Sequence, residues 1–448
     1  MKAPPMVVYD WTGFYIGVNG GISVARDRTQ LLTTLPSAEQ SALSPFGAIG
    51  GGQLGYNWQI NNSWLLGIET DLQASGETTN RTCLLSCTAT LSANLNQKID
   101  WFGTTRARVG IVDGPVLSYF TGGVAYGHYS TTVTETGGLL GAASPIVMTS
   151  GRTSVGWTYG SGIEAALGGN WTGKIEYMYI DLGRRTDVFA TALLGPQTLS
   201  TRIHDHVFRA GLNYRFGGTG LTVTPPTANW AGFYIGLNAG GLLGRNPSSL
   251  TFPGNAELFH LMPGAYQGGG QIGYNWQAGS WVFGLETDLQ GVFGDDKDAC
   301  VAICSAATGV NIKQTLPWFG TTRGRVGYSL GSTLFYGTGG FAYGSTRTVL
   351  NEYAPGGIAQ VTINRTRGGW TAGAGIESPL KFLGLFGPNW TAKTEYLYVD
   401  LGNTSNGFTA LATPQVFSTR TQEHIFRGGI NYHFNAPPPP VMPLATKG

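Results

Sequence analysis

The chain has 448 residues, a formal net charge of +2 and only 12% charged residues, about half the usual share. The nearly neutral charge excludes a basic nucleic-acid-binding surface, and the lack of any run of 18 apolar residues excludes transmembrane helices. Few charges together with 12% aromatic residues still favour a membrane protein. The closed β-barrel is the other structure that satisfies every backbone polar group in lipid.

The first ten residues precede any regular pattern. Residues 1–10 contain neither the long apolar core nor the cleavage site of a secretory leader. We expect this segment to lie in the periplasm. Because a barrel of this kind must be exported, we also expect that a leader has been trimmed or that the start codon is misplaced.

Alternation of apolar and polar residues, typical of β-strands, recurs in about eight segments of the first half. We predict strands over residues 11–25, 48–60, 63–76, 98–112, 116–130, 153–168, 171–184 and 202–216. Short turns alternate with long polar loops, which cover residues 26–47, 77–97, 131–152 and 185–201. This rhythm predicts an all-β fold, an antiparallel up-and-down transmembrane barrel with its long loops outside the cell.

The seventh segment shows what each strand face carries. Trp171, Tyr177 and Tyr179 share one face, whereas Lys174 and Glu176 share the other. Aromatic side chains toward the ends of an apolar face are typical of the girdles at membrane interfaces. A soluble sandwich would not place aromatic residues outward and charges inward, so we assign the apolar face to lipid and the charged face to a lumen.

The inward charges of the first half are balanced. We predict a lumen network of Glu69, Asp71, Glu164 and Glu176 with Arg106, Arg108, Lys174 and Arg209. Eight strands leave an interior just wide enough for side chains to fill, and a buried charge persists there only when it is paired. We expect inward glycines to make room for the long Arg and Glu chains: Gly55, Gly67, Gly160, Gly162 and Gly211.

The whole pattern then repeats. Trp11-Thr-Gly-Phe-Tyr-Ile-Gly17 returns as Trp230-Ala-Gly-Phe-Tyr-Ile-Gly236, and Trp101 returns at Trp318, so the offset stays near 217 residues. A period of this length indicates a duplicated domain rather than a solenoid. The second lumen network is predicted to contain Glu286, Asp288, Glu377 and Glu395 with Arg323, Arg325, Lys393 and Arg427.

The repeat defines the domain boundaries. We place one barrel over residues 11–216, a linker over 217–229, a second barrel over 230–434 and a Pro-rich periplasmic tail over 435–448. A hairpin within one sheet needs only about 2–5 residues, whereas this linker reaches roughly 40 Å at about 3.3 Å per residue. We therefore predict two eight-stranded barrels rather than one 16-stranded barrel.

The four cysteines form two close pairs. Cys83 with Cys87 and Cys300 with Cys304 lie in matching polar loops, without further His or Cys residues nearby. Zinc sites usually use shorter spacings and more ligands, whereas paired cysteines in an oxidising compartment favour disulfides. We expect two local disulfides and no metal.

Three other patterns have simpler interpretations. Residues 50–55 fit the spacing of a nucleotide-binding glycine motif, but they lie inside an alternating strand rather than between a strand and a helix. His204 and His206 share a strand face, yet the second copy has Gln422 in place of His204. For these reasons we expect no cofactor. Because no Ser/His/Asp or Asp/His set recurs in both copies, we also expect that the protein is not an enzyme.

These motifs give the chain a family resemblance. WTGFYIG at 11–17, WFGTTRARVG at 101–110 and the closing NYRF and NYHF resemble the small outer-membrane β-barrel surface proteins of alphaproteobacteria, often labelled porin-family or surface-antigen proteins. The resemblance covers nearly the whole chain twice. It implies eight-stranded barrels in the outer membrane, surface-exposed loops and a terminal aromatic signature at Phe216 and Phe434. Such proteins ordinarily have one barrel per chain and end at the terminal aromatic residue.

The sequence is compatible with three functions. The first is a structural and surface-interaction protein whose partners are outer-membrane lipid, lipopolysaccharide, the barrel-assembly machinery and a host or environmental ligand at the loops, but no nucleic acid. The second is a porin-like diffusion channel for small solutes, and the third, ranked last, is an outer-membrane enzyme. Eight strands leave no open aqueous channel, whereas 16 strands do, so the barrel architecture separates the first two.

Overall fold

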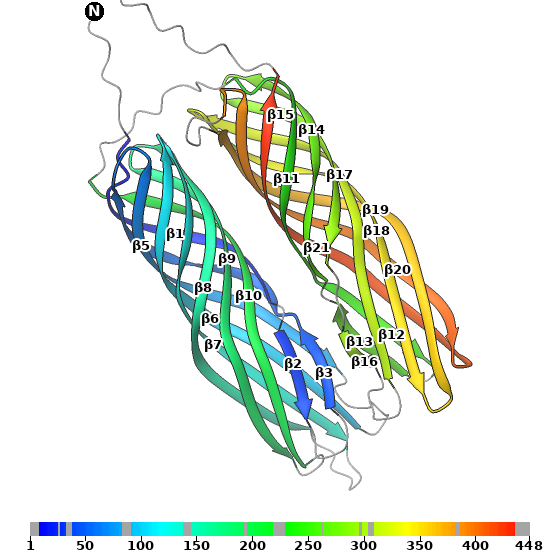
Figure 1. The fold of residues 1–448 in the computed structure, drawn as a ribbon. Helices are drawn as coiled ribbons and strands as arrows, with labels where there is room; N and C mark the ends of the chain where they lie inside the picture. Colours follow the sequence, from blue (N-terminus) through cyan, green and yellow to red (C-terminus); the bar gives the residue numbers. More distant parts are fainter. Residues whose placement is uncertain are drawn as a thin grey trace, which may run out of the picture.

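In the computed structural model, the chain forms two elongated β-barrels that lie side by side (Figure 1). No helix in the described part of the chain is long and apolar enough to cross a membrane. The structure describes residues 9–25, 27–32, 38–82, 91–137, 145–191, 195–217, 229–253, 255–261, 263–294, 298–302, 309–380 and 386–434.

The first barrel has eight antiparallel strands. They are β1 (Gly13–Ala25), β4 (Phe46–Gln59), β5 (Trp64–Thr82), β6 (Leu91–Asp113), β7 (Val116–Gly137), β8 (Ile146–Gly168), β9 (Trp171–Thr191) and β10 (Gly195–Arg215). Neighbours in the sequence pair in turn. The barrel closes where β1 pairs with β10, from Tyr15 opposite Arg215 to Ala25 opposite Asp205.

The second barrel repeats this order. Its strands are β11 (Gly232–Gly244), β14 (Gly264–Ala278), β15 (Trp281–Phe293), β17 (Gly309–Leu330), β18 (Thr333–Ala354), β19 (Gly357–Pro379), β20 (Trp390–Ala410) and β21 (Thr413–His433). It closes through β11 and β21. Within the described ranges no strand of one sheet pairs with the other, so the prediction of two eight-stranded barrels is confirmed and the 16-stranded alternative is wrong.

The strands run farther toward the extracellular side than the sequence pattern indicated. β7 continues to Gly137 and β9 to Thr191, into stretches that we expected to be polar loops. Shorter strands extend the wall further: β2 (Asp27–Leu32), β3 (Ala38–Leu43), β12 (Asn246–Phe252), β13 (Asn255–Leu261) and β16 (Asp298–Ala302). The expectation of unstructured loops is therefore wrong for these stretches. Polar β-branched residues in these stretches, such as Thr131 and Thr132, favour the strand conformation. The strand pairing therefore continues beyond the lipid.

The predicted faces are confirmed. Three tryptophans point outward near the periplasmic ends of their strands: Trp58, Trp64 and Trp171. The exposed fraction of each side chain is about half or higher. Trp157 and Tyr159 stack outside the barrel near the middle of β8, with ring centroids 5.7 Å apart. The two sets of rings bracket an apolar band, as in the aromatic girdles of membrane barrels.

A bulge interrupts β9 at a motif that both copies share. Asp181 and Gly183 face consecutive residues of β10, which leaves Leu182 unpaired between them. Gly183 adopts a φ of 82°, and its amide donates to Asp181 Oδ1 over 2.8 Å. The second copy has the same geometry at Asp400 and Gly402, so the match between residues 177–183 and 396–402 reflects a local backbone requirement.

The barrels touch through a short row of aromatic rings, which we call the aromatic seam: Tyr177, Phe208, Tyr396 and Phe426. Tyr177 lies 5.1 Å from Phe426, and Phe208 lies 5.2 Å from Tyr396, between ring centroids. Tyr177 and Tyr396 are equivalent in the repeat, as are Phe208 and Phe426. The seam is therefore isologous, like the interface of a twofold-symmetric dimer.

Candidate functional site

The lumen of the first barrel holds all eight charges that the sequence assigned to it. They come from β5, β6, β8, β9 and β10, at positions where the alternation turns the side chain inward. Arg106, Arg108 and the carboxylates that form ion pairs with them are buried. The exposed fraction of each of these side chains is 0–1%. This charge network lies in the middle of a closed wall and has no open side.

Arg106 is the centre of the network. Its guanidinium contacts three carboxylates, with N···O distances of 2.5 Å to Glu69, 2.9 Å to Asp71 and 2.9 Å to Glu176. One planar, permanently charged group therefore bridges acidic residues from two strands. A guanidinium is suited to this position because it offers five donors in a fixed geometry.

The remaining cations complete the pairing. Arg108 contacts Glu164 at 2.8 Å, and Lys174 contacts Glu69 at 2.8 Å. Arg209 reaches Asp71 at 2.9 Å and Glu176 at 2.6 Å. Each of the four carboxylates thus faces at least one cation, which is the condition for keeping ionised groups away from water.

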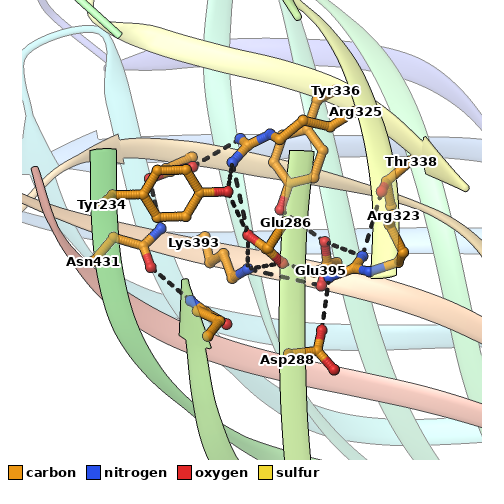
Figure 2. A network of polar contacts seen from close by, with 12 residues as sticks. Tyr234, Glu286, Asp288, Arg323, Arg325, Tyr336, Thr338, Lys393, Glu395 and Asn431 are labelled. Atoms are coloured by element: carbon orange, nitrogen blue, oxygen red, sulfur yellow. Dashed lines mark hydrogen bonds and ion pairs between the residues drawn. The ribbon is translucent and has the colours of Figure 1, made fainter. Parts of the chain in front are cut away.

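The second barrel reproduces the network, as Figure 2 shows around Glu286. Arg323 pairs with Glu286, lies 3.0 Å from Asp288 and lies 2.9 Å from Glu395. Lys393 approaches Glu286 at 2.9 Å. The outer members pair in the same way: Arg325 with Glu377, and Arg427 with Asp288 and Glu395.

Tyrosine hydroxyls belong to the network too, although the sequence pattern did not single out their contacts. Tyr15 donates to Glu69 over 2.8 Å and accepts from Arg108 over 2.6 Å, while Tyr119 donates to Glu176 over 3.0 Å. A Cβ added at Gly55 would lie 2.3 Å from the Tyr15 ring, and one at Gly162 would lie 2.5 Å from the Tyr119 hydroxyl. These two glycines therefore make room for tyrosine rings, not for Arg and Glu chains as we expected.

A buried tryptophan closes the periplasmic end of each lumen. Trp11, which we expected inside the first strand, precedes β1 and packs against the inward residues Leu65, Val112 and Leu117. Its exposed fraction is 0%, and its indole Nε1 donates to the Gly114 carbonyl over 3.0 Å. The equivalent residue of the second barrel is Trp230, which has an exposed fraction of 2%. Its indole Nε1 donates to the Ser329 hydroxyl over 3.0 Å.

An apolar layer fills the lumen on the extracellular side of the charge network. In the first barrel its members include Ile99, Phe102, Met178, Ile180 and Val207, all buried. The second barrel has a matching layer: Leu316, Phe319, Leu397, Val399 and Ile425. The sequence pattern did not lead us to predict this layer. The available signal was that Met178 and Ile180 continue the inward face that carries Lys174 and Glu176.

The other assigned residues have local roles or lie outside the described part. Cys83, Cys87 and Cys304, and the side chain of Cys300, are outside the described residues, so the two disulfides stay a prediction. In the parts that the structure describes, no three His, Cys, Asp or Glu residues are arranged to hold a metal ion. His206 Nδ1 lies 2.9 Å from the Tyr177 hydroxyl.

The terminal aromatic residues lie at the periplasmic rim of each barrel. The amide of Phe216 donates to the Phe14 carbonyl over 2.8 Å, and the amide of Phe434 donates to the Phe233 carbonyl over 3.0 Å. More than half of each aromatic side chain is exposed. These bonds join the last residue of each barrel to its first strand.

Comparisons with known proteins agree with this architecture. The family model described as "Outer membrane protein beta-barrel domain" matches residues 1–216 and again residues 219–434. The "31 kDa outer-membrane immunogenic protein" of Brucella melitensis is 36% identical over 226 residues, which cover 48% of this chain and 87% of that protein. The "22 kDa outer membrane protein" of Rhizobium leguminosarum is 33% identical over 177 residues, which cover 39% of this chain and 66% of that protein.

Among solved structures, the outer membrane protein OprG from Pseudomonas aeruginosa is 14% identical, with a TM-score of 0.29. The match covers 46% of this chain and 99% of that chain.

Proposed function

Since the chain belongs to the outer membrane β-barrel family, with one family domain in each half, we propose that it is a structural and surface-interaction protein whose sealed barrels carry long extracellular extensions. Its location is the outer membrane. The observation that carries the proposal is the closure of both lumens at three levels. A buried tryptophan, a network of paired charges and an apolar layer follow one another along each barrel.

The alternative is a diffusion channel, and the lumen argues against it. An ion would have to separate Arg106 from three carboxylates at once and then cross the apolar layer around Phe102 and Met178. Breaking a buried pair costs about 3–5 kcal/mol because an uncompensated charge remains. Each barrel should therefore be electrically silent.

Conductance of the intact protein in a planar lipid bilayer tests this directly. We expect no steady current above the bare bilayer after insertion, because neither lumen offers a continuous aqueous path. A large-pore porin of known conductance, inserted under the same conditions, shows that the bilayer reports channels. Steady conductance on the nanosiemens scale from the purified chain would refute the sealed lumen and favour the channel.

The extracellular extensions are the part that we propose to act on partners. β6, β7, β8 and β9 each have at least 21 residues, about twice the 9–11 residues that a tilted strand needs to cross a bilayer. Relatives named as immunogenic outer-membrane proteins support exposure at the cell surface. The proposed partners are lipid and lipopolysaccharide around the wall, the assembly machinery during insertion, and a host or environmental ligand at the loops.

An epitope inserted after residue 140, in the connection between β7 and β8, should be detected by antibody on intact cells. This connection joins two strands that extend past the outer aromatic girdle, so the epitope should lie outside the membrane. The matched control places the same epitope after residue 222, in the linker that joins the periplasmic ends of the barrels. That epitope should be detected only after the outer membrane is permeabilised, and the opposite pattern would reverse the proposed orientation.

The carboxylates in the lumens do not suit catalysis. Glu69 and Glu176 are fully buried, and each is paired with cations inside a closed wall. A catalytic acid or base needs access to a substrate as well as an adjusted pKa. We therefore propose that these charges fill and hold the lumen and that the protein is not an enzyme.

A further inference from the structure

An apolar cleft of about 620 Å³ lies between the two barrels. The first barrel contributes Val18, Ala210 and Leu212 to its walls, and the second contributes Trp281, Phe335 and Ala374. These side chains belong to the outward faces of the strands. The cleft is therefore bounded by the outer faces of both barrels, in the space that lipid occupies.

The cleft lies on the periplasmic side of the aromatic seam. Along β10, Ala210 and Leu212 come between Phe208, in the seam, and Phe216, at the periplasmic rim. On the second barrel, Trp281 begins β15 directly after the short turn from β14. The cleft thus lies at the depth of the periplasmic leaflet, and the seam separates it from the extracellular side.

The lining of the cleft matches hydrocarbon. Its walls are mainly apolar, and glycines at positions 20, 173 and 337 recess them. Water does not fill an apolar cavity without polar partners, and an empty cavity would forfeit the dispersion contacts of its lining. Only acyl chains are present in quantity at this depth.

We propose that this cleft binds an acyl chain of a phospholipid from the periplasmic leaflet and that the bound chain completes the packing between the barrels. Next to the cleft, Ile163 of the first barrel packs in one apolar cluster with Ile376 and Phe335 of the second. A chain held between two rigid walls exchanges more slowly than the lipid around a single barrel. It is therefore retained when the protein is extracted gently.

Native mass spectrometry of the full chain, extracted from outer membranes in mild detergent, tests this proposal. The wild-type protein should keep one phospholipid as a resolved mass adduct. Ala374→Phe and Ala210→Phe each fill the cleft from a different barrel, and each should reduce the adduct at least fivefold. Ala107→Phe is the matched control, because Ala107 lies on the exposed outer face of β6 and does not line the cleft.

Two variants from different barrels keep the test decisive if one of them does not fold, because the heat-modifiable gel shift identifies the folded one. An adduct equally abundant in Ala107→Phe and in the folded cleft variants would overturn the proposal. So would a wild-type protein that retains no lipid, or one that retains lipopolysaccharide instead of phospholipid. The mass of the adduct distinguishes these two lipids.

Discussion

Replacing Arg106 by Leu should lower the free energy of unfolding of the first barrel by about 3–5 kcal/mol. The substitution removes the cation that contacts Glu69, Asp71 and Glu176 and leaves three carboxylates around an apolar side chain, away from water. Urea unfolding in detergent micelles, followed by the loss of the heat-modifiable band on unboiled gels, measures the change.

Two further variants make this result specific. Arg184→Leu changes an exposed arginine on β9 and should alter stability by no more than about 0.5 kcal/mol. Arg323→Leu should have the same large effect as Arg106→Leu, but on the second barrel, because its contacts are equivalent. An unchanged unfolding midpoint for Arg106→Leu would mean that the lumen is hydrated and that the ion pairs contribute little.

Truncating the buried tryptophan should be comparably harmful. Trp11→Ala removes a side chain with an exposed fraction of 0%, its hydrogen bond to Gly114, and its contact with Arg215, whose guanidinium carbon lies 5.3 Å from the ring centroid. Loss of a fully buried tryptophan costs about 3–5 kcal/mol. The same urea titration, with intrinsic fluorescence as a second signal, would detect it.

Trp58→Ala is the control for this variant, because Trp58 faces lipid with an exposed fraction of 64%. It should cost much less than Trp11→Ala. We expect both variants to remain silent in the bilayer assay, since the charge network and the apolar layer still close the lumen. If both tryptophan variants lost stability equally, Trp11 would be an interfacial anchor and not a closure of the lumen.

The part of the fold inside the membrane could be predicted because lipid imposes a strict rule on it. Outward side chains there are mainly apolar or aromatic, so a strand such as β9 shows Trp171 and Tyr177 alternating with Lys174 and Glu176. The lumen charges follow from the same alternation. The duplication followed from motifs that return at a nearly constant offset, and the long linker indicated separate barrels.

The parts that could not be predicted lie where this rule no longer applies. Beyond the outer girdle, both faces of β7 tolerate polar residues, so Thr131 and Thr132 do not distinguish a strand from a loop. Trp11 was included in the first predicted strand, residues 11–25, and only the chain path shows it turning beneath the lumen. The apolar layer was missed because its residues are inward and apolar, against the prevailing pattern.

The aromatic seam has a consequence for how the two halves can change. In a pair of identical barrels every substitution at the interface would occur twice, whereas in one continuous chain each side mutates alone.

The contacts already differ on the two sides. The Arg245 guanidinium carbon lies 5.6 Å from the centroid of the Phe46 ring, and Arg245 Nε donates to the Ser44 carbonyl over 3.1 Å. The position matching Phe46 in the second copy is Gly264, since Gln53 and Gln271 set that offset at 218 residues. A matching contact between an arginine and a ring therefore cannot form on the other side, and the two halves of the interface are not equivalent. An antibody or ligand that spans both barrels thus meets two different surfaces, always in the same order.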